Sequence, residues 1–296
     1  YIRGELSGRG PVVQPAPPRI ACNADCQWTD RHDGSNPRLA FAQWMFQPGN
    51  PLVARVIANR IWMYHFGRSL CGNPSDLGVV DSEPTHPELL DWLATELQAS
   101  GWSIKALHRK ILLSATYRQA GASTHLAPAD REMLQLCVDS DPDNRLYGRF
   151  PRKRLEGEVI RDALLAVAGL SNQAYGGPSV MPPVPYELKQ TLLRGQWQTS
   201  AEESDHYRRS IYVFARRNLR YPIFEVFDRP DAGATCPQRN TSTTAIQSLQ
   251  LLNSDLAVNC AKALSQRVLR ETASAPNVDA MLEHVFEIVY SRRPTS

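Results

Sequence analysis

The chain has 296 residues, of which 42% are hydrophobic and 21% are charged, and its formal net charge is +3. These proportions are close to globular averages and exclude a disordered chain, a collagen-like repeat and a disulfide-dense miniprotein. The small net charge argues against nucleic-acid binding by bulk electrostatics, and no apolar run reaches the roughly 18 residues of a membrane span. We therefore expect no nucleic-acid partner and no membrane span in this segment.

Residues 1–37 are rich in proline and lack hydrophobic periodicity, which predicts an extended arm or linker. Cys22 and Cys26 lie in this arm at a spacing that matches neither haem attachment nor a paired zinc knuckle. A local disulfide between them is one option in an oxidising compartment. The other four cysteines are expected to be buried small hydrophobic residues.

After the arm, apolar residues recur at the spacing of amphipathic helices. We expect Asn50 to cap one helix, with Pro51 at its first position and Gly67 as its end. Residues 85–88 have the spacing of a capping box, and Ser103 is expected to cap the helix after it. The helices predicted in this half of the chain lie near residues 39–46, 51–66, 87–99 and 104–115.

The next helix is predicted over about residues 155–167, and its charged residues are expected to form a salt-bridged solvent face. Arg154 would then pair with Glu158, and Glu158 with Arg161. Residues 176–185 hold two glycines and four prolines and are predicted to be non-helical, and the long connection from there to about Tyr207 is predicted to run over the surface.

Residues 209–215 alternate in the manner of a strand, with Ile211 and Val213 on one side. Helices resume near residues 245–253, 255–269 and 279–290. The predicted class is therefore mainly α, an irregular helical domain with a minor β-hairpin or short strand element and long loops. We expect a single domain over residues 38–296, truncated at its C-terminus.

Several polar residues of the first half are candidates for ligand binding, although each also has a structural explanation. Arg55 and Asn59 are four residues apart and share a helix face. His65 lies at a helix end, where a cation suits the helix dipole. His86 lies at a helix start, where a neutral imidazole that donates a hydrogen bond is expected. His108 borders an apolar stripe and is expected to be a core histidine.

The loop over residues 227–244 combines aspartate, arginine, asparagine and hydroxyl residues before a helix N-terminus, a setting that can hold an anion or a sugar. Its candidate ligand-binding residues are Asp228, Asp231, Arg239 and Thr243. Ser242 or Thr243 is equally explained as a helix cap. Only five of the 33 basic residues are lysines, and this arginine bias permits internal ion pairs or an anionic ligand.

Motifs with a defined chemistry are missing from the sequence. The seven histidines form no H-E-x-x-H motif, and no acidic calcium loop occurs, so we predict no metal site. Residues 176–178 lack the frame of a phosphate-binding loop, and no G-x-S-x-G elbow occurs. We predict no cofactor, and the sequence assigns no catalytic residue.

A set of short segments, taken together, resembles one family. The segments include PTHPELLDWL at 84–93, SATYRQ at 114–119, DPDNRL at 141–146, FDRPD at 227–231 and STT at 242–244. They are similar to the Planctomycete Secreted Domain of the first type, domain of unknown function 1553, and the likeness runs from about Arg38 to the end of the chain. Arg118, in the second of these segments, is a further candidate ligand-binding residue.

The resemblance implies a compartment and an architecture rather than a chemistry. Such domains typically lie at the C-terminal end of exported proteins, behind a second domain of unknown function and often a cytochrome c-like haem domain. The resemblance therefore implies an extracytoplasmic location, periplasmic or secreted, and a haem domain in the same or another chain as a partner. No haem-attachment motif occurs in this sequence.

We expect the domain to be a binding or accessory module for an anionic polysaccharide or a protein partner. The candidate ligand-binding residues, expected to meet around one concavity, are Arg55, Asn59, His65, His86, Arg118, Asp228, Asp231, Arg239 and Thr243. One alternative is a polysaccharide-acting enzyme with Asp228, Asp231 and His86 as its polar candidates, which would need two carboxylates roughly 5–10 Å apart. Another alternative is a scaffold that docks a haem electron-transfer domain.

Overall fold

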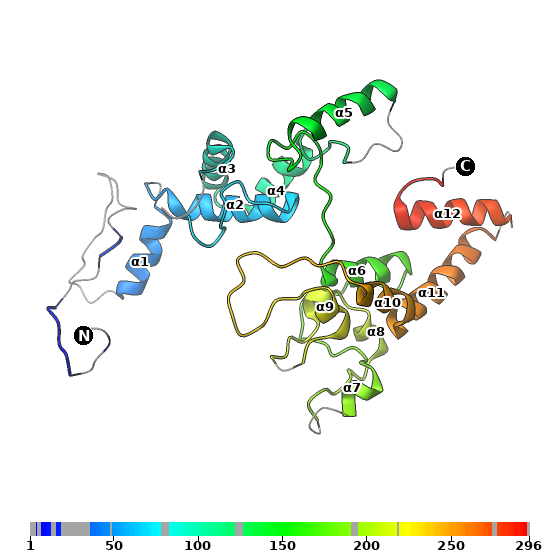
Figure 1. The fold of residues 1–296 in the computed structure, drawn as a ribbon. Coiled ribbons are helices and arrows are strands. Elements are labelled where there is room, and N and C mark those ends of the chain that lie inside the picture. The colour runs from blue at the N-terminus through cyan, green and yellow to red at the C-terminus, as the bar shows by residue number, and fades with distance from the viewer. Residues whose placement is uncertain are drawn as a thin grey trace. The chain divides into compact units, whose positions relative to one another are not determined.

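The computed structural model of the chain consists mainly of helices joined by loops (Figure 1). The structure describes residues 4, 7–12, 16–18, 36–47, 49–77, 83–121, 127–190, 195–217, 219–273 and 277–294. Cys22 and Cys26 lie outside these described residues. The chain divides into two compact units, Tyr1–Lys153 and Arg154–Ser296. A single domain over residues 38–296 stays a prediction.

The predicted mainly α class is confirmed. The first unit contains α1 (Pro37–Met45), α2 (Leu52–Phe66), α3 (Pro87–Ala99), α4 (Ile104–Leu113) and α5 (Pro128–Ser140). The second unit contains α6 (Gly157–Val167), α7 (Tyr186–Gln190), α8 (Glu203–His206), the 3₁₀ turn η2 (Ser210–Tyr212), α9 (Pro222–Val226), α10 (Ala245–Asn253), α11 (Asp255–Glu271) and α12 (Val278–Tyr290). Helices α5, α7, α8 and α9 lie outside the predicted ranges.

The core of the first unit forms where α3 packs against α2 and α4. Trp62 and Phe66 of α2 stack with their ring centroids 4.1 Å apart. They share a buried cluster with Leu93 and Leu97 of α3 and Leu107 of α4. Burying side chains of this size contributes roughly 1.5–3 kcal/mol each, so the helical spacing of these residues accounts for the packing of the three helices.

Two of the three predicted caps in this unit are confirmed. The Asn50 side chain accepts hydrogen bonds from the first backbone N–H groups of α2, at 2.9 and 3.4 Å. The Ser103 hydroxyl accepts one from the first turn of α4 at 3.2 Å. The capping box predicted at residues 85–88 is wrong, because the Thr85 hydroxyl donates to the Leu70 carbonyl at 3.3 Å instead of capping α3.

In the second unit, α6 packs against α9, η2 and α11. The buried side chains between these elements include Trp197, Tyr221, Ile223, Phe224 and Phe227. Helix α11 also contacts α10 and α12. The bounds of α10 match the predicted range, and α11 and α12 differ from theirs by one or two residues.

The prediction that residues 176–207 run over the surface is wrong in part. Val180 and Trp197 are buried, and Val180 exchanges backbone hydrogen bonds with Tyr212 at 2.8 Å and Phe214 at 2.9 Å. Helices α7 and α8 begin only after the proline-rich residues 178–185, and proline carries no N–H that would need a partner when buried. A segment with many prolines can therefore enter a core without regular structure.

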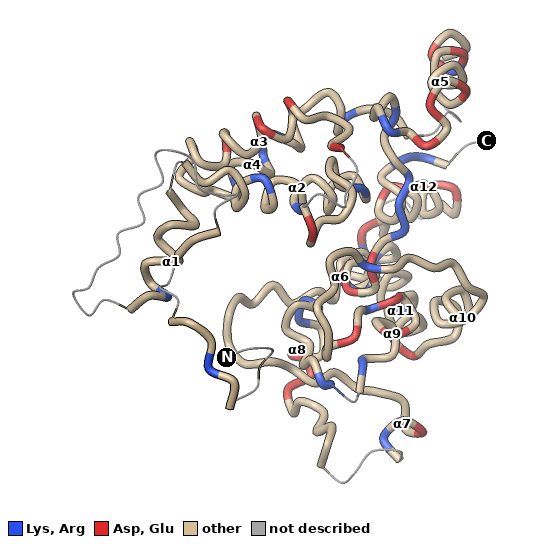
Figure 2. Tube along the Cα trace, turned by 60° about the vertical axis from the view of Figure 1, so that its left-hand side comes forward, with Lys and Arg blue, Asp and Glu red and all other residues tan. Residues whose placement is uncertain are grey.

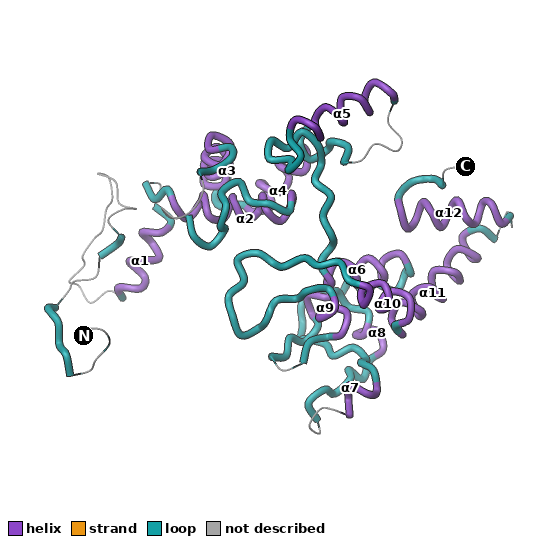
Figure 3. The backbone as a smooth tube through the Cα atoms, viewed as in Figure 1, coloured by secondary structure: helices purple, strands orange, loops and turns teal. Residues whose placement is uncertain are grey.

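The strand predicted over residues 209–215 is also wrong. Residues Ser210–Tyr212 form a 3₁₀ turn, and pairing near them is limited to an isolated bridge between Val180 and Val213. Ile211 is 77% exposed and Val213 is 5% exposed, so the two side chains do not share a side. In the described part of the chain, extended pairing consists of isolated bridges, and Figure 3 accordingly draws helices and loops.

The predicted ion pairs along α6 are wrong as well. Arg154 pairs with Asp228 at 2.5 Å, and Glu158 pairs with Arg239 at 2.8 Å. Arg161 is not on a solvent face at all, since its exposure is 0%. Basic and acidic residues are interspersed along both units (Figure 2), so an arginine meets carboxylates from distant parts of its own unit.

The four described cysteines divide into two groups. Cys71 and Cys260 are buried, as predicted. Cys137 is half-buried and Cys236 is exposed, so the prediction of burial is wrong for Cys236. Cys236 lies in the polar loop before α10, where no apolar helix face is present to cover it.

Candidate functional site

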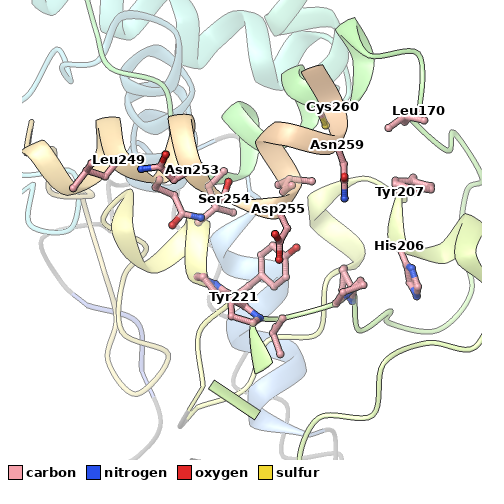
Figure 4. A pocket seen from close by; sticks show the side chains of 18 of the residues that line it. Leu170, His206, Tyr207, Tyr221, Leu249, Asn253, Ser254, Asp255, Asn259 and Cys260 are labelled. Carbon is pink, nitrogen blue, oxygen red and sulfur yellow. The ribbon is translucent and has the colours of Figure 1, made fainter. Parts of the chain in front are cut away.

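A pocket of about 450 Å³ lies within the second unit (Figure 4). Its walls come from residues 182–185, residues 221–223, α10 and the first turns of α11. Leu170, His206 and Tyr207 complete the lining. Pockets of roughly 300–1,000 Å³ hold drug-sized ligands, so this volume suits a small organic molecule rather than a single ion.

The junction between α10 and α11 builds a polar wall. Ser254 ends α10 by donating its N–H to the Gln250 carbonyl at 3.2 Å, and its hydroxyl caps α11 by accepting a backbone N–H at 3.3 Å. Asp255 and Asn259 are four residues apart on α11, so they share a face. Both line the pocket with Gln250 and Asn253 of α10. Figure 4 shows the Asp255 side chain projecting from α11 into the pocket.

Residues 182–185, with the sequence Pro-Pro-Val-Pro, build an apolar wall. The Pro182 carbonyl accepts a hydrogen bond from the indole N–H of Trp197 at 2.9 Å, and the Met181 N–H donates to the Ser200 hydroxyl at 3.0 Å. These bonds hold the segment in place. Because proline has no N–H, this wall offers a ligand apolar surface and few backbone donors.

Arg161 of α6 lies buried behind two of the lining residues. Its guanidinium donates to the carbonyls of His206 at 2.6 Å and Arg208 at 2.9 Å, and to the Ser210 hydroxyl at 3.2 Å. It also lies 5.7 Å from the centroid of the Tyr221 ring. Arg161 therefore holds the backbone at His206 and the ring of Tyr221 in their places in the pocket wall.

The ionisable groups of the wall near Arg161 are held neutral. Burial raises the pKa of Tyr221, against the opposing charge of Arg161. Burial and a hydrogen bond to Glu203 raise the pKa of Tyr207. Burial likewise raises the pKa of the Cys260 thiol. Since the ordinary pKa values of these groups already exceed about 8, both hydroxyls and the thiol keep their protons near pH 7.

The pocket carries little charge. Among the described residues that line it, Asp255 is the one acidic residue and none is lysine or arginine. His206 has its Nε2 2.8 Å from the Ser200 carbonyl, and because a carbonyl only accepts, this nitrogen carries the proton. The site therefore combines apolar walls with amide and hydroxyl groups and one carboxylate.

Two of the sequence-predicted residues, Arg55 and Asn59, lie on α2 and have separate surroundings. Arg55 pairs with Asp91 at 2.5 Å, and this hydrogen bond lowers the pKa of the Asp91 carboxyl. Asn59 is fully buried, and its amide both donates to and accepts from the backbone of Cys71 at 3.2 and 3.1 Å. The shared helix face thus supports an ion pair at one position and a buried backbone contact at the other.

Of the three other predicted residues of the first unit, His65 lies in the last turn of α2, His86 directly precedes α3, and Arg118 follows α4. His65 Nε2 is 2.7 Å from His108 Nδ1, a contact between distant helices that spacing does not reveal. His86 Nδ1 is 3.0 Å from the Thr85 hydroxyl, in line with the expected hydrogen-bonded imidazole. Arg118 is exposed just after α4.

In the second unit, Asp228 and Arg239 each belong to an ion pair. Asp228 has a φ of 60° and accepts hydrogen bonds from Arg154 at 2.5 Å and from the Ser242 N–H and hydroxyl at 2.8 Å. Burial acts to raise the pKa of Asp228, but the Ser242 hydrogen bonds and the Arg154 charge outweigh it and lower the pKa. Arg239 contacts Glu158 at 2.8 Å, so both predicted charges have partners.

Asp231 and Thr243 are the remaining predicted residues. Asp231 lies 3.6 Å from Arg220, and Thr243 is exposed. Neither Ser242 nor Thr243 caps α10, because Thr244 does so in a capping box with the residue three positions on. None of the nine sequence-predicted residues lines the pocket.

The pocket residues escaped the sequence analysis because no motif marks them. Two local signals could have drawn attention to the region. The run of three prolines among residues 182–185 excludes a helix, and the sequence Asn253-Ser254-Asp255 places polar residues at the joint between two predicted helices. Neither signal shows that the two segments face each other.

The contact between His65 and His108 leads to a prediction for the pH dependence of stability. Burial lowers the pKa of His65, and the neighbouring His108 and Lys153 lower it further. The unfolded state, with a pKa near 6.5, therefore binds a proton at a higher pH than the folded state does. We expect the free energy of unfolding to fall as the pH is lowered from about 7.5 to about 5.5.

Urea unfolding at both pH values checks this expectation. In His65→Gln the loss of stability on acidification should be smaller than in the unmodified chain, because the group that resists protonation is gone. An equal loss in both proteins would show that this histidine pair does not contribute to the pH dependence.

The described residues show neither a metal-binding cluster nor a membrane-spanning helix. Within them, no group of three or more His, Cys, Asp or Glu side chains is placed to hold a metal ion. Over the same residues, every helix is too short or too polar to cross a lipid bilayer.

Comparison with protein families supports the resemblance seen in the sequence. A family model described as PSD1, protein of unknown function (DUF1553), matches residues 37–296. No curated protein and no solved structure matches the chain. The match covers both the pocket and all nine sequence-predicted residues.

Proposed function

Since the chain belongs to the PSD1 (DUF1553) family, whose description assigns no activity, we propose from its pocket that the second unit is a non-catalytic ligand-binding module. The observation that carries the proposal is the pocket of about 450 Å³, in which the proline-rich segment and Ile246, Leu249 and Leu256 supply apolar lining and the junction of α10 and α11 supplies the polar groups. A pocket that combines apolar lining with a few polar groups is the usual form of a small-molecule site.

The lining favours binding over bond cleavage. Hydrolysis of a glycoside uses a pair of carboxyl groups, whereas Asp255 is the one acidic residue among the described residues that line the pocket. The Cys260 thiol has a raised pKa and is therefore a poor nucleophile. The Nε2 of His206 is engaged by a carbonyl. A polysaccharide-acting enzyme is thus the less supported alternative.

An anionic polysaccharide is also less supported as the ligand. The arginines of the loop before α10 are paired, since Arg239 contacts Glu158 and Glu156, and Arg229 lies 3.6 Å from Glu158. Asp228 is likewise paired with Arg154. An anion would have to displace these carboxylates, whereas an uncharged ligand can enter the pocket without breaking an ion pair.

The cellular setting stays part of the proposal. We place the module outside the cytoplasm, periplasmic or secreted, beside a haem domain of the same or another chain. Both features rest on the resemblance of the sequence to exported proteins.

A fragment screen with a blocked pocket tests the proposal. Asn259→Trp should fill the pocket, while Gln266→Trp makes the same change on an exposed face of α11 outside it. Saturation-transfer NMR with a library of small uncharged fragments should detect ligands of the unmodified chain and of Gln266→Trp. Most of these ligands should be lost in Asn259→Trp.

The opposite result would contradict the proposal. If fragments bind Asn259→Trp as well as they bind the unmodified chain, the pocket is not the binding site and the proposal fails. Circular dichroism of both variants verifies that the tryptophan has not unfolded α11.

A further inference from the structure

We infer that the pocket takes an uncharged sugar ring of a neutral polysaccharide or oligosaccharide, an inference that rests on the proposed function and specifies its ligand.

The polar wall has unused hydrogen-bonding capacity. Within the described residues, the side chains of Gln250, Asn253, Asp255 and Asn259 make no hydrogen bond or ion pair of their own, although all four line the pocket. The carboxylates of Asp91 and Asp228, by contrast, are paired with arginines. The polar groups of this wall are therefore available to a ligand.

The chemistry of this wall matches hydroxyl groups. An amide side chain supplies both donors and an acceptor, and an ionised carboxylate supplies acceptors that can serve two adjacent hydroxyls. Asp255 and Asn259 share one face of α11. A carboxylate that only accepts hydrogen bonds therefore lies beside an amide that both donates and accepts them. Sugar hydroxyls both donate and accept, and they can satisfy such a mixed set.

The opposite wall suits the carbon face of a sugar ring. Residues 182–185 and Tyr221 line the pocket, although Val184 and Tyr221 are only 8% and 7% exposed, so they contribute small apolar surfaces. Tyr207 and Tyr221 keep their phenolic protons, because burial raises both pKa values. A ring with C–H groups on its faces and hydroxyls at its edge would contact both walls at once.

Anions and extended peptides fit less well. An anion would face Asp255 with no lysine or arginine among the described lining residues. A peptide that binds as an added strand is held by a ladder of backbone hydrogen bonds, but the Pro-Pro-Val-Pro wall has an N–H only at Val184. Recognition through side chains, as for a sugar, is the mode that these walls favour.

The test compares defined ligands on the full chain by isothermal titration calorimetry. The neutral probes are cellotriose and mannotriose, the anionic probe is trigalacturonate, and the peptide probe is a proline-rich hexapeptide. We expect at least one neutral sugar to bind. Asp255→Asn should weaken that binding about tenfold, because a charged acceptor is replaced by a neutral one.

Asp279→Asn is the matched control. Asp255 and Asp279 both lie in the first turn of a helix, so either change removes the same interaction with the helix dipole. Asp279 is exposed on α12 and does not line the pocket. Asp279→Asn should therefore leave the sugar affinity within about twofold of that of the unmodified chain.

Each other outcome overturns the inference. Tighter binding of trigalacturonate or of the peptide would assign a different ligand, and neutral binding that is insensitive to Asp255→Asn would place the sugar elsewhere. If neither neutral sugar binds while fragments still depend on the pocket, the sugar inference fails and the binding function stands. If fragment binding is also unchanged in Asn259→Trp, both the sugar inference and the proposed binding function fail.

Discussion

Replacement of Arg161 by alanine is expected to lower the free energy of unfolding of the second unit by about 3–5 kcal/mol. The guanidinium is the donor for two backbone carbonyls, at His206 and Arg208, and for the Ser210 hydroxyl. Arg161 is 0% exposed, so water cannot replace the lost donors without entering the core. Each buried acceptor left without a partner costs about 1–3 kcal/mol.

Urea unfolding and hydrogen exchange measure this effect. Amides of α6, α8 and η2 should lose protection in Arg161→Ala before amides of the first unit do. Arg209→Ala is the control, because Arg209 neighbours Arg208 but is exposed, and its effect should stay within about 0.5 kcal/mol. A similarly small effect of Arg161→Ala would mean that the buried guanidinium is not needed to hold the pocket wall.

Asp228→Ala is expected to cost about 1–3 kcal/mol of stability. The carboxylate joins three segments, since it accepts hydrogen bonds from Arg154 before α6 and from Ser242 before α10. Charge-assisted bonds of this kind contribute about 1.5–3 kcal/mol. Asp228 also has a φ of 60°, a left-handed conformation that aspartate tolerates better than alanine.

Two further variants separate these contributions in thermal unfolding. Asp228→Asn keeps the side-chain size and the tolerance of positive φ, so its loss should be smaller than that of alanine and should reflect the loss of the charge and of one acceptor oxygen. Asp231→Ala changes an exposed carboxylate 3.6 Å from Arg220 and should have almost no effect. Equal losses for the alanine changes at Asp228 and Asp231 would contradict a structural role for the Asp228 contacts.

Several helices could be predicted because their signals are local. Ser103 caps α4, Asn50 caps α2, and the bounds of α10 agree with the predicted range. Helical hydrogen bonds and caps join residues no more than about four positions apart. Helix α5 was not predicted, although Leu134, Cys137 and Val138 recur at helical spacing, and none of its residues is fully buried.

The charged residues show where local spacing is insufficient. Spacing pairs Arg154 with Glu158, but Arg154 precedes α6 and meets Asp228, which is 74 residues away. The spacing of Arg161 from its neighbours in the sequence is the same as for an exposed helical arginine. In the structure, however, α9, η2 and α11 pack against α6, and Arg161 is buried. An arginine takes whichever carboxylate or carbonyl the packing brings near, and that partner is not encoded in its neighbourhood.

Most of the longer helices, the caps of α2 and α4 and the membership of a helical family can be read from the order of the residues, because each depends on interactions over a few positions or on short recurring segments. The pocket depends on packing between remote segments. Residues 182–185 and Asp255 lie some seventy positions apart along the chain, and they line one pocket in a unit where α6 packs against α9 and α11. Contacts of that range follow from the folding of the whole unit.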